Sequence, residues 1–283
     1  KALTIMSGSL VNDRGSIDSL DALFVRSGSI ANGSGSIIAR GGAGLSVNGL
    51  TGQVLTLTNN TGTLASTGAL EVTADAIDNT GSILGQSGSL TFNALTNSGD
   101  IYGSSLTLGG ASLINTGGEI GSSGAIDIAA SMLDNRSGLI TSGAGGLTVA
   151  GAVLLNASGT LGGDGDVTLN TGNIDNGTGT IAAGRDLVIT AATLANAAGG
   201  GLWAERGARL SVSDTLTNRG SIGAGTLLQA NAATLDNGSG TDVGTLAAGV
   251  HLSLGFTNAN LGRLVTGSDL TLAPTGDYIH AAS

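Results

Sequence analysis

The feature that most constrains the fold of this chain is a short repeat that occurs along its whole length. In each copy, an aliphatic residue stands two positions before an asparagine, a glycine follows, and short runs of alternating aliphatic residues complete the period. Residues 174–193, IDNGTGTIAAGRDLVITAAT, contain one full period, with Asn176, Gly179 and Gly184 between the aliphatic runs. A fixed period of about 20 residues is typical of solenoid proteins. Aligned on the asparagine, the copies occur at Asn12, Asn32, Asn59, Asn79, Asn97, Asn115, Asn135, Asn156, Asn176, Asn196, Asn218, Asn237 and Asn258.

Each period predicts three short strands and three corners. In the period that begins at Ile77, the aliphatic segments centre on Ile77, on Ile83, and on Leu90 with Phe92. Spacing at i, i+2 indicates strands, and the Gly, Asn and Ser clusters between them indicate turns, whereas helical spacing is absent. Three strands and three corners close a triangular coil that cannot bury its own interior, so the coils must stack. We therefore expect an all-β fold, a parallel β-helix (solenoid) of about thirteen triangular turns of ~20 residues.

Stacking predicts two kinds of row along the coil. Aliphatic side chains should lie on their equivalents in the neighbouring turns and form the core. The asparagines should form a structural ladder, because amide side chains bond to their equivalents in adjacent turns and asparagine tolerates left-handed corners. The core row expected from the repeat consists of Leu10, Ile17, Ile37, Leu64, Ile83, Ile101, Ile120, Ile140, Leu161, Ile181 and Leu202.

The repeat also predicts the domain organisation. We expect residues 1–283 to form a single β-helix repeat segment. Neither end has a recognisable capping sequence, and an uncapped sheet edge promotes aggregation, so we expect a fragment of a longer rod. Two stretches interrupt the pattern: an insertion around residues 48–53, and residues 199–209, GGGLWAERGAR.

Composition excludes several protein classes. Hydrophobic residues make up 40% of the chain and charged residues 11%, which is too apolar for a disordered chain despite 51 glycines. No apolar run approaches the roughly 18 residues that a membrane span needs, so we expect no membrane-embedded part. The absence of cysteine excludes disulfides and thiolate metal sites. The net charge of −10 and the lack of a basic stripe argue against nucleic-acid binding.

Three stretches carry a resemblance to a known family: LDNRSGLITSGAGGLTVA (133–150), IDNGTGTIAAGRDLVITA (174–191) and LTNRGSIGAGTLLQA (216–230). They resemble the filamentous haemagglutinin repeat of large exoproteins that Gram-negative bacteria export by two-partner secretion. The period and the Asn and Gly positions agree along essentially the whole chain. The resemblance implies a right-handed β-helix that is secreted or lies at the cell surface, with an outer-membrane transporter as its partner during export. It also implies a virulence-associated role as the shaft of an adhesin, which meets a receptor or glycan on host or bacterial surfaces.

Two alternatives remain beside the adhesin shaft. The first, which the resemblance fits equally well, is the stalk of a contact-dependent growth-inhibition effector, which delivers a toxin. The second is a polysaccharide-active β-helix enzyme, which needs carboxylates and bases clustered on one face. We predict a non-enzymatic protein, because the histidines are only His251 and His280, and the acidic residues recur once per turn at solvated corners. Four of the chain's 20 acidic residues exemplify this position between the aliphatic residue and the asparagine: Asp78, Asp134, Asp175 and Asp236.

The predicted contact surface consists of Trp203, Arg206 and Arg209. Tryptophan and arginine often anchor interfaces, and exposed aromatic rings stack on sugars. The alternative is that Trp203 covers an irregular corner and that the charges are solvated. We expect no cofactor and no metal, since GGDGDV (162–167) departs from the calcium-binding motif at Val167. Six Asn-x-Ser/Thr sequons coincide with the asparagine row, where we expect buried side chains: Asn32, Asn59, Asn135, Asn156, Asn176 and Asn237.

Overall fold

The computed structural model describes residues 1–239, 241–276 and 278–279. It divides into two compact units, Lys1–Asp134 and Asn135–Ser283. The described residues contain strands, turns and bends but no helix, and none of their elements is a helix able to cross a membrane. The prediction of an all-β parallel β-helix is confirmed, with about 14 turns in the two units together. His280 lies outside the described residues.

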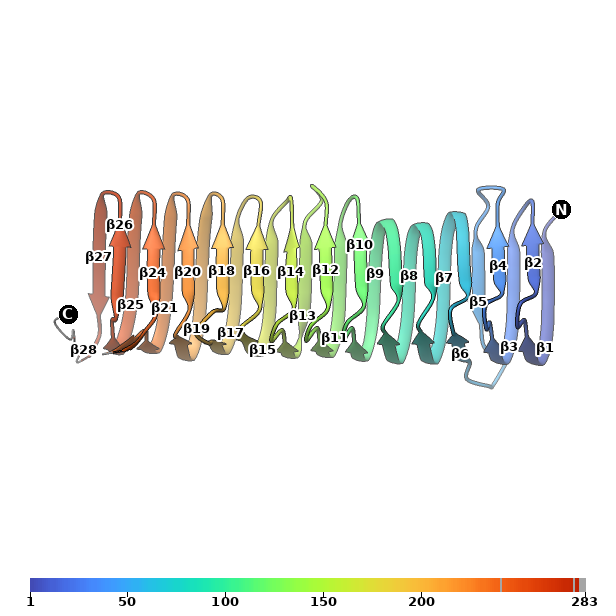
Figure 1. Cartoon of the computed structure of the whole chain (residues 1–283), viewed down its shortest axis with the longest axis horizontal. Coiled ribbons are helices and arrows are strands. Elements are labelled where there is room, and N and C mark those ends of the chain that lie inside the picture. The colour runs from blue at the N-terminus through green and yellow to red at the C-terminus, as the bar shows by residue number, and fades with distance from the viewer. Residues whose placement is uncertain (240, 277, 280–283) are drawn as a thin grey trace. The chain divides into compact units, whose positions relative to one another are not determined.

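In the first unit, each turn stacks in parallel on the turn before it (Figure 1). Leu3 of β1 lies beside Leu23 of β3, and the pairing repeats turn by turn. Some strands continue around the corners. A single strand, such as β7 with 17 residues, then covers most of one turn. The strands are β1 (Leu3–Val11), β2 (Ser16–Ser19), β3 (Leu23–Ala31), β4 (Ser36–Ala39), β5 (Leu45–Asn48), β6 (Thr56–Asn59), β7 (Thr63–Asn79), β8 (Ser82–Asn97), β9 (Asp100–Ile114), β10 (Glu119–Ser122) and β11 (Ile126–Asp134).

The second unit has a more regular plan, in which a four-residue strand alternates with a longer one. The long strands bend at a corner, where the register shifts, as between Ala191 and Thr193. The strands are β12 (Leu139–Ser142), β13 (Leu147–Leu155), β14 (Thr160–Gly163), β15 (Val167–Gly177), β16 (Thr180–Ala183), β17 (Leu187–Asn196), β18 (Gly201–Ala204), β19 (Gly207–Asn218), β20 (Ser221–Ala224), β21 (Leu227–Asp236), β22 (Gly238–Ser239), β23 (Asp242–Val243), β24 (Thr245–Ala248), β25 (His251–Asn260), β26 (Arg263–Thr266), β27 (Asp269–Pro274) and β28 (Tyr278–Ile279).

The core consists of aliphatic rows, one of which differs from the expected row by a single residue. From Ile37 onwards, the expected members are fully buried and stack in register within each unit. Leu10 was wrongly placed in this row, because it pairs with Ile30 and belongs to a second row that continues through Leu57 and Ile77. Leu10 precedes its asparagine whereas Ile17 follows it, so the two residues belong to different faces of the coil.

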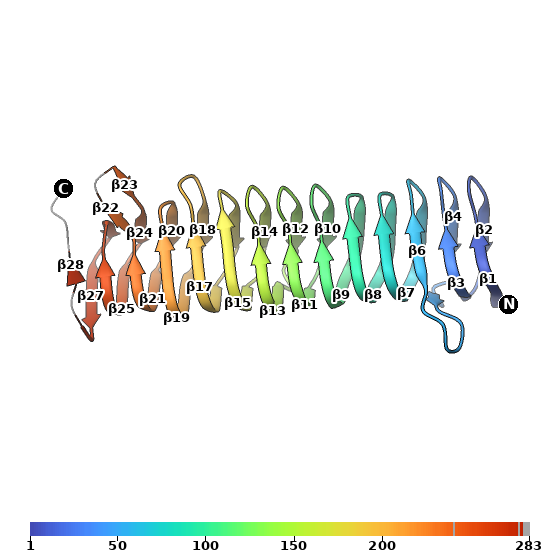
Figure 2. The same ribbon diagram turned by 90° about the horizontal axis from the view of Figure 1, so that it is seen from below.

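The first interruption of the repeat is an insertion loop, residues 49–55, between β5 and β6. Figure 2 shows it projecting from the first unit. The second predicted interruption, residues 199–209, keeps the regular register, since Trp203 lies between Ala182 and Gly223 of the neighbouring turns. The corner before it is only slightly longer, and Gly199 has a positive φ of 89° there.

A third interruption of the repeat was not predicted from the sequence. The strands β22 and β23 form an antiparallel hairpin in the corner after Asn237. Asn258, which the repeat assigned to the asparagine ladder, instead lies exposed beside Thr234. The ladder position after Asn237 belongs to Leu261, whose exposure is 1% and whose carbonyl oxygen accepts from Asn237 Nδ2 at 2.7 Å. Because the hairpin adds residues to this turn, the next ladder position comes later in the sequence than Asn258. Phe256-x-Asn258 has the same spacing of apolar residue and asparagine as the repeat, which led to the wrong assignment.

Candidate functional site

The asparagine ladder is the most regular polar feature of the molecule. In each unit, Nδ2 of one asparagine donates to Oδ1 of the asparagine in the following turn, at 2.7–2.9 Å. The ladder residues are almost fully buried. They are Asn12, Asn32, Asn59, Asn79, Asn97 and Asn115 in the first unit, and Asn135, Asn156, Asn176, Asn196, Asn218 and Asn237 in the second.

The ladder also explains the spacing between asparagine and glycine in the repeat. Asn176 Nδ2 donates to the carbonyl oxygen of Gly179 at 2.8 Å, which closes the corner. A Cβ atom on Gly179 would collide with the backbone oxygen of Asn156, so only glycine fits this position. The left-handed corner residue is not asparagine itself but a residue that follows it, two positions later at Ser158 (φ 59°) and one position later at Gly177 (φ 48°).

The ladder geometry bears directly on the sequons. The six sequon asparagines have 0% exposure, and their side-chain nitrogens donate within the ladder. In the folded chain these nitrogens are inaccessible to a modifying enzyme.

Trp203 is exposed on the flat face formed by the short strands of the second unit. Its side chain comes from β18, with Leu202 and Ala204 pointing into the core on either side of it. The indole lies over Gly223 of β20, where an added Cβ would meet Trp203 Cζ3 at 2.5 Å. The ring is 48% exposed, so one of its faces packs on a glycine while the remainder is accessible. Trp203 therefore does not cover an irregular corner.

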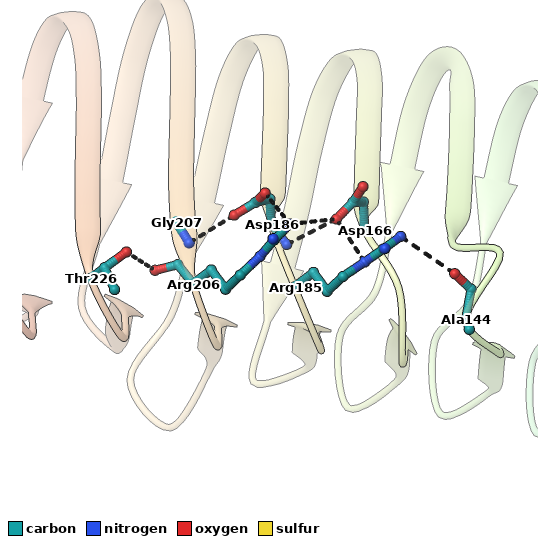
Figure 3. Close-up of polar contacts among 7 residues, drawn as sticks. All are labelled: Ala144, Asp166, Arg185, Asp186, Arg206, Gly207 and Thr226. Carbon is teal, nitrogen blue, oxygen red and sulfur yellow. Dashed lines mark hydrogen bonds and ion pairs between the residues drawn. The ribbon is translucent and has the colours of Figure 1, made fainter.

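Arg206 belongs to a separate cluster at the neighbouring corner (Figure 3). Its Nη2 lies 2.6 Å from Asp186 Oδ2 and 3.6 Å from Asp166 Oδ1. Arg185 Nε lies 3.3 Å from the same Asp166 oxygen, and the Gly207 amide donates to Asp186 Oδ1 at 2.9 Å. The side chains are about half exposed, so each pair contributes only a few tenths of a kcal/mol to stability. The cluster neutralises its own charge and holds successive corners together.

Arg209 lies on the next face. It comes from β19, beside Val188 and Gln229 of the neighbouring turns, and its Nη1 donates to Gln229 Oε1 at 2.6 Å. A recess of about 290 Å³ adjoins it, lined by Asp186, Leu187, Val188, Gly207, Thr226 and Leu227. Among the described residues, no hydrogen bond or ion pair joins Trp203, Arg206 and Arg209. The three lie on successive parts of one turn rather than in one cluster.

Sequence reasoning missed a further cluster around Arg219. Its guanidinium bonds Asp236 Oδ2 at 2.6 Å and Asp242 Oδ2 at 2.9 Å, and so ties the β22–β23 hairpin to the turn before it. The bond from Arg219, with help from the Gly238 amide, lowers the pKa of Asp236, although partial burial opposes this effect. The same carboxylates raise the pKa of Arg219. The sequence shows Asp242 but not its partner, because only the fold brings this aspartate next to Arg219.

The remaining acidic and histidine side chains considered as sites, among the described residues, are spread over separate turns. Asp78 and Asp175 are exposed as expected, whereas Asp134 is buried and Asp236 is ion-paired. His251 Nδ1 lies 3.8 Å from Asp269 Oδ2 and its Nε2 lies 3.3 Å from Thr271 Oγ1. The described residues hold no group of three His, Cys, Asp or Glu side chains suited to a metal ion. Asp166, in the motif that resembles a calcium site, is instead paired with arginines.

Comparison with known families adds an independent observation. The family model described as the haemagglutinin repeat matches residues 1–105, 103–151 and 140–220, which together cover well over half of the chain. Searches of curated proteins and of solved structures gave no match.

Proposed function

Because the chain belongs to the haemagglutinin repeat family, we propose that it is the structural shaft of a large secreted or surface-exposed bacterial exoprotein that supports adhesion. The shaft keeps other parts of the exoprotein at a distance from the cell. Its surface also offers shallow contacts to a receptor or glycan on host cells.

The observation that carries this proposal is the repetition of one bonding scheme from turn to turn. The ladder asparagine, the corner glycine and the aliphatic rows recur through both units, while Arg185, Arg206 and Arg219 pair with neighbouring aspartates. Such a construction gives mechanical regularity through contacts between neighbouring turns. It supports a shaft better than a polysaccharide-active enzyme, which needs convergent acids and bases.

The same construction suits export through an outer-membrane transporter. Each turn contacts only its neighbours, so the chain can fold turn by turn as it emerges. The absence of cysteine leaves no disulfide to form before or after passage. We therefore propose two-partner secretion as the route and the bacterial surface or the medium as the destination.

The test is direct binding of the purified, labelled chain to host epithelial cells and to bacterial cells. Saturable binding to host cells supports the adhesive role. Saturable binding to bacteria alone would instead favour the stalk of a contact-dependent inhibition effector. Binding to neither kind of cell would contradict the adhesive role and leave only the role of a structural spacer.

The predicted contact residues are tested in the same assay. Trp203→Ala, Arg206→Ala and Arg209→Ala are compared one by one with Asn258→Ala, a control that alters an exposed side chain elsewhere on the second unit. If the contact surface is correct, Trp203→Ala weakens host-cell binding several-fold, since buried aromatic anchors dominate interfaces. Unchanged binding of all three variants would remove this surface from the proposal.

A further inference from the structure

The chain contains four Asn-Gly pairs, and the environment of one asparagine in the fold differs from that of the other three. The pairs are Asn32-Gly33, Asn48-Gly49, Asn176-Gly177 and Asn237-Gly238. An Asn-Gly pair is the sequence most open to succinimide formation, because glycine has no Cβ to hinder the approach of its backbone nitrogen to the asparagine side chain. We propose that Asn48 is a site of spontaneous deamidation in the folded protein and that the other three are protected by the ladder.

In the three ladder pairs, both reacting groups are held away from each other. The asparagines are fully buried, and Asn176 Nδ2 donates to Asn196 Oδ1 at 2.8 Å while Asn237 Nδ2 donates to Leu261 O at 2.7 Å. Reaction there requires the side chain to leave the ladder, which breaks these bonds in a buried environment.

The attacking nitrogen is also occupied in all three ladder pairs. The Gly33 amide donates to Asp13 Oδ1 at 3.0 Å. In the second unit, the Gly177 amide donates to Asp175 Oδ1 at 3.0 Å and the Gly238 amide to Asp236 Oδ1 at 3.1 Å. Each amide therefore points at a carboxylate rather than at the asparagine Cγ atom.

Asn48 has a different environment. It is the last residue of β5, it is only partly buried, and its Nδ2 donates to Ser46 Oγ at 2.7 Å, a bond to a rotatable hydroxyl near the surface. Gly49 opens the insertion loop, whose residues 51–54 are exposed. Solvent base and water therefore reach this pair without opening of the ladder.

The chemical step is balanced without a cofactor. The Gly49 nitrogen forms a bond to Asn48 Cγ, the Cγ–Nδ2 bond breaks, and the side-chain nitrogen leaves as ammonia with the proton given up by the Gly49 amide. Water then opens either carbonyl of the ring and yields aspartate or isoaspartate. In the aspartate product, residue 48 lies in register with Arg26 of β3 on the neighbouring turn, so the new side-chain carboxylate is placed next to an arginine position at the base of the loop.

The test follows the four pairs in the whole chain during incubation in mildly alkaline buffer. Peptide mapping by mass spectrometry gives the conversion at each asparagine, and hydroxylamine cleavage traps the succinimide. A sample kept in denaturant measures the intrinsic rate of all four pairs. Asn48→Gln serves as the matched variant, because the longer side chain disfavours ring closure.

We expect the four pairs to react at similar rates in denaturant. In the folded chain, conversion at Asn48 should exceed conversion at the other three by more than about tenfold, since only local opening exposes the ladder. Asn48→Gln should remove the dominant product. Equal protection of all four pairs, or faster conversion at a ladder asparagine, would overturn the proposal.

Discussion

At the scale of single residues, the ladder asparagine is defined by having a donor and an acceptor on one short side chain. Asn156 accepts from Asn135 through Oδ1 and donates to Asn176 through Nδ2. Aspartate has the same shape but only accepts, and alanine does neither. The repeated choice of asparagine is therefore a requirement of the bond pattern rather than of corner conformation, because the residues with positive φ follow the asparagine.

This requirement predicts the effect of Asn176→Asp. The carboxylate would face Asn196 Oδ1, another acceptor, in a buried position. We expect a loss of at least about 2 kcal/mol in the free energy of unfolding, because buried unpaired acceptors and charges are costly. Urea denaturation followed by circular dichroism measures the change.

Asn258→Asp is the matched control for that substitution. Asn258 is exposed and lies outside the ladder, so we expect a change within about 0.5 kcal/mol. Equal losses in the two variants would mean that the ladder bonds do not stabilise the fold.

At the scale of elements, aromatic side chains fill the space above glycines of the following turn. Trp203 of β18 lies over Gly223 of β20, and Phe92 of β8 lies against Gly110 of β9. A ring gains contact area where the next strand has no side chain, which is how aromatic residues compensate for glycine in sheets.

The Trp203–Gly223 pair gives a spectroscopic prediction. Gly223→Ala places a methyl group within 2.5 Å of the indole, so the ring must move outward. The chain has one tryptophan, and we expect its fluorescence maximum to shift to longer wavelength as the ring enters water. The stability should change by less than about 1 kcal/mol, because half of the ring is already exposed.

Gly201→Ala is the control, since a Cβ atom there meets nothing within 4 Å. Its spectrum should match that of the unaltered chain. A shift in both variants would show that the emission responds to general loosening of β18 rather than to the ring contact.

The Arg219 cluster makes the β22–β23 hairpin sensitive to acid. The folded chain lowers the pKa of Asp236, so its ion pair stabilises the hairpin above the ordinary aspartate pKa of about 3.9 and is lost as the pH falls through the lowered value. The protection of the Gly238 and Val243 amides against hydrogen exchange should therefore fall in acid relative to the protection of β21 and β24.

Arg219→Ala should strongly weaken this pH dependence, because Asp236 then loses its ion-pair partner at every pH and keeps only the bond from the Gly238 amide. Arg209→Ala removes the same charge from the second unit without touching the hairpin and serves as the control. Retention of the acid transition in Arg219→Ala would place its origin in another group.

In the whole molecule, the features that repeat in successive turns could be predicted from the sequence, whereas the features that occur once could not. The period, the strand class and most ladder positions follow from the sequence, because the same pattern recurs in every turn. The row of Leu10, the place of Asn258 and the β22–β23 hairpin depend on the pairing register between turns, which a non-repeating insertion shifts. Asp242 has no equivalent in the other turns, so the repeat pattern could not predict its ion pair with Arg219.

The residues of the predicted contact surface differ in how far the sequence could predict their positions. The exposure of Trp203 could be predicted, since it alternates with aliphatic residues that point inward. Its separation from Arg206 and Arg209 could not, because the corner between β18 and β19 turns the chain onto another face.

Calcium should leave the stability of the folded chain unchanged. Asp166 is engaged by Arg185 and Arg206, and the described residues offer no acidic cluster for a cation. We expect neither calcium nor a chelator to shift the thermal unfolding midpoint, because only ligands bound to the folded state raise it. A rise of the midpoint with calcium concentration would contradict the assignment of these aspartates to ion pairs.

The asparagine ladder has one more property, which is its direction. Within each unit, every amide donates toward the following turn, so the side-chain dipoles point the same way and add together, as peptide dipoles do in a helix. A duplicated or deleted turn leaves every remaining amide with an identical partner, whereas a partial insertion must leave the coil as a loop, as residues 49–55 do. Gene duplication can therefore lengthen or shorten such a protein in steps of one turn, and its reach can evolve without any change in the rules that fold it.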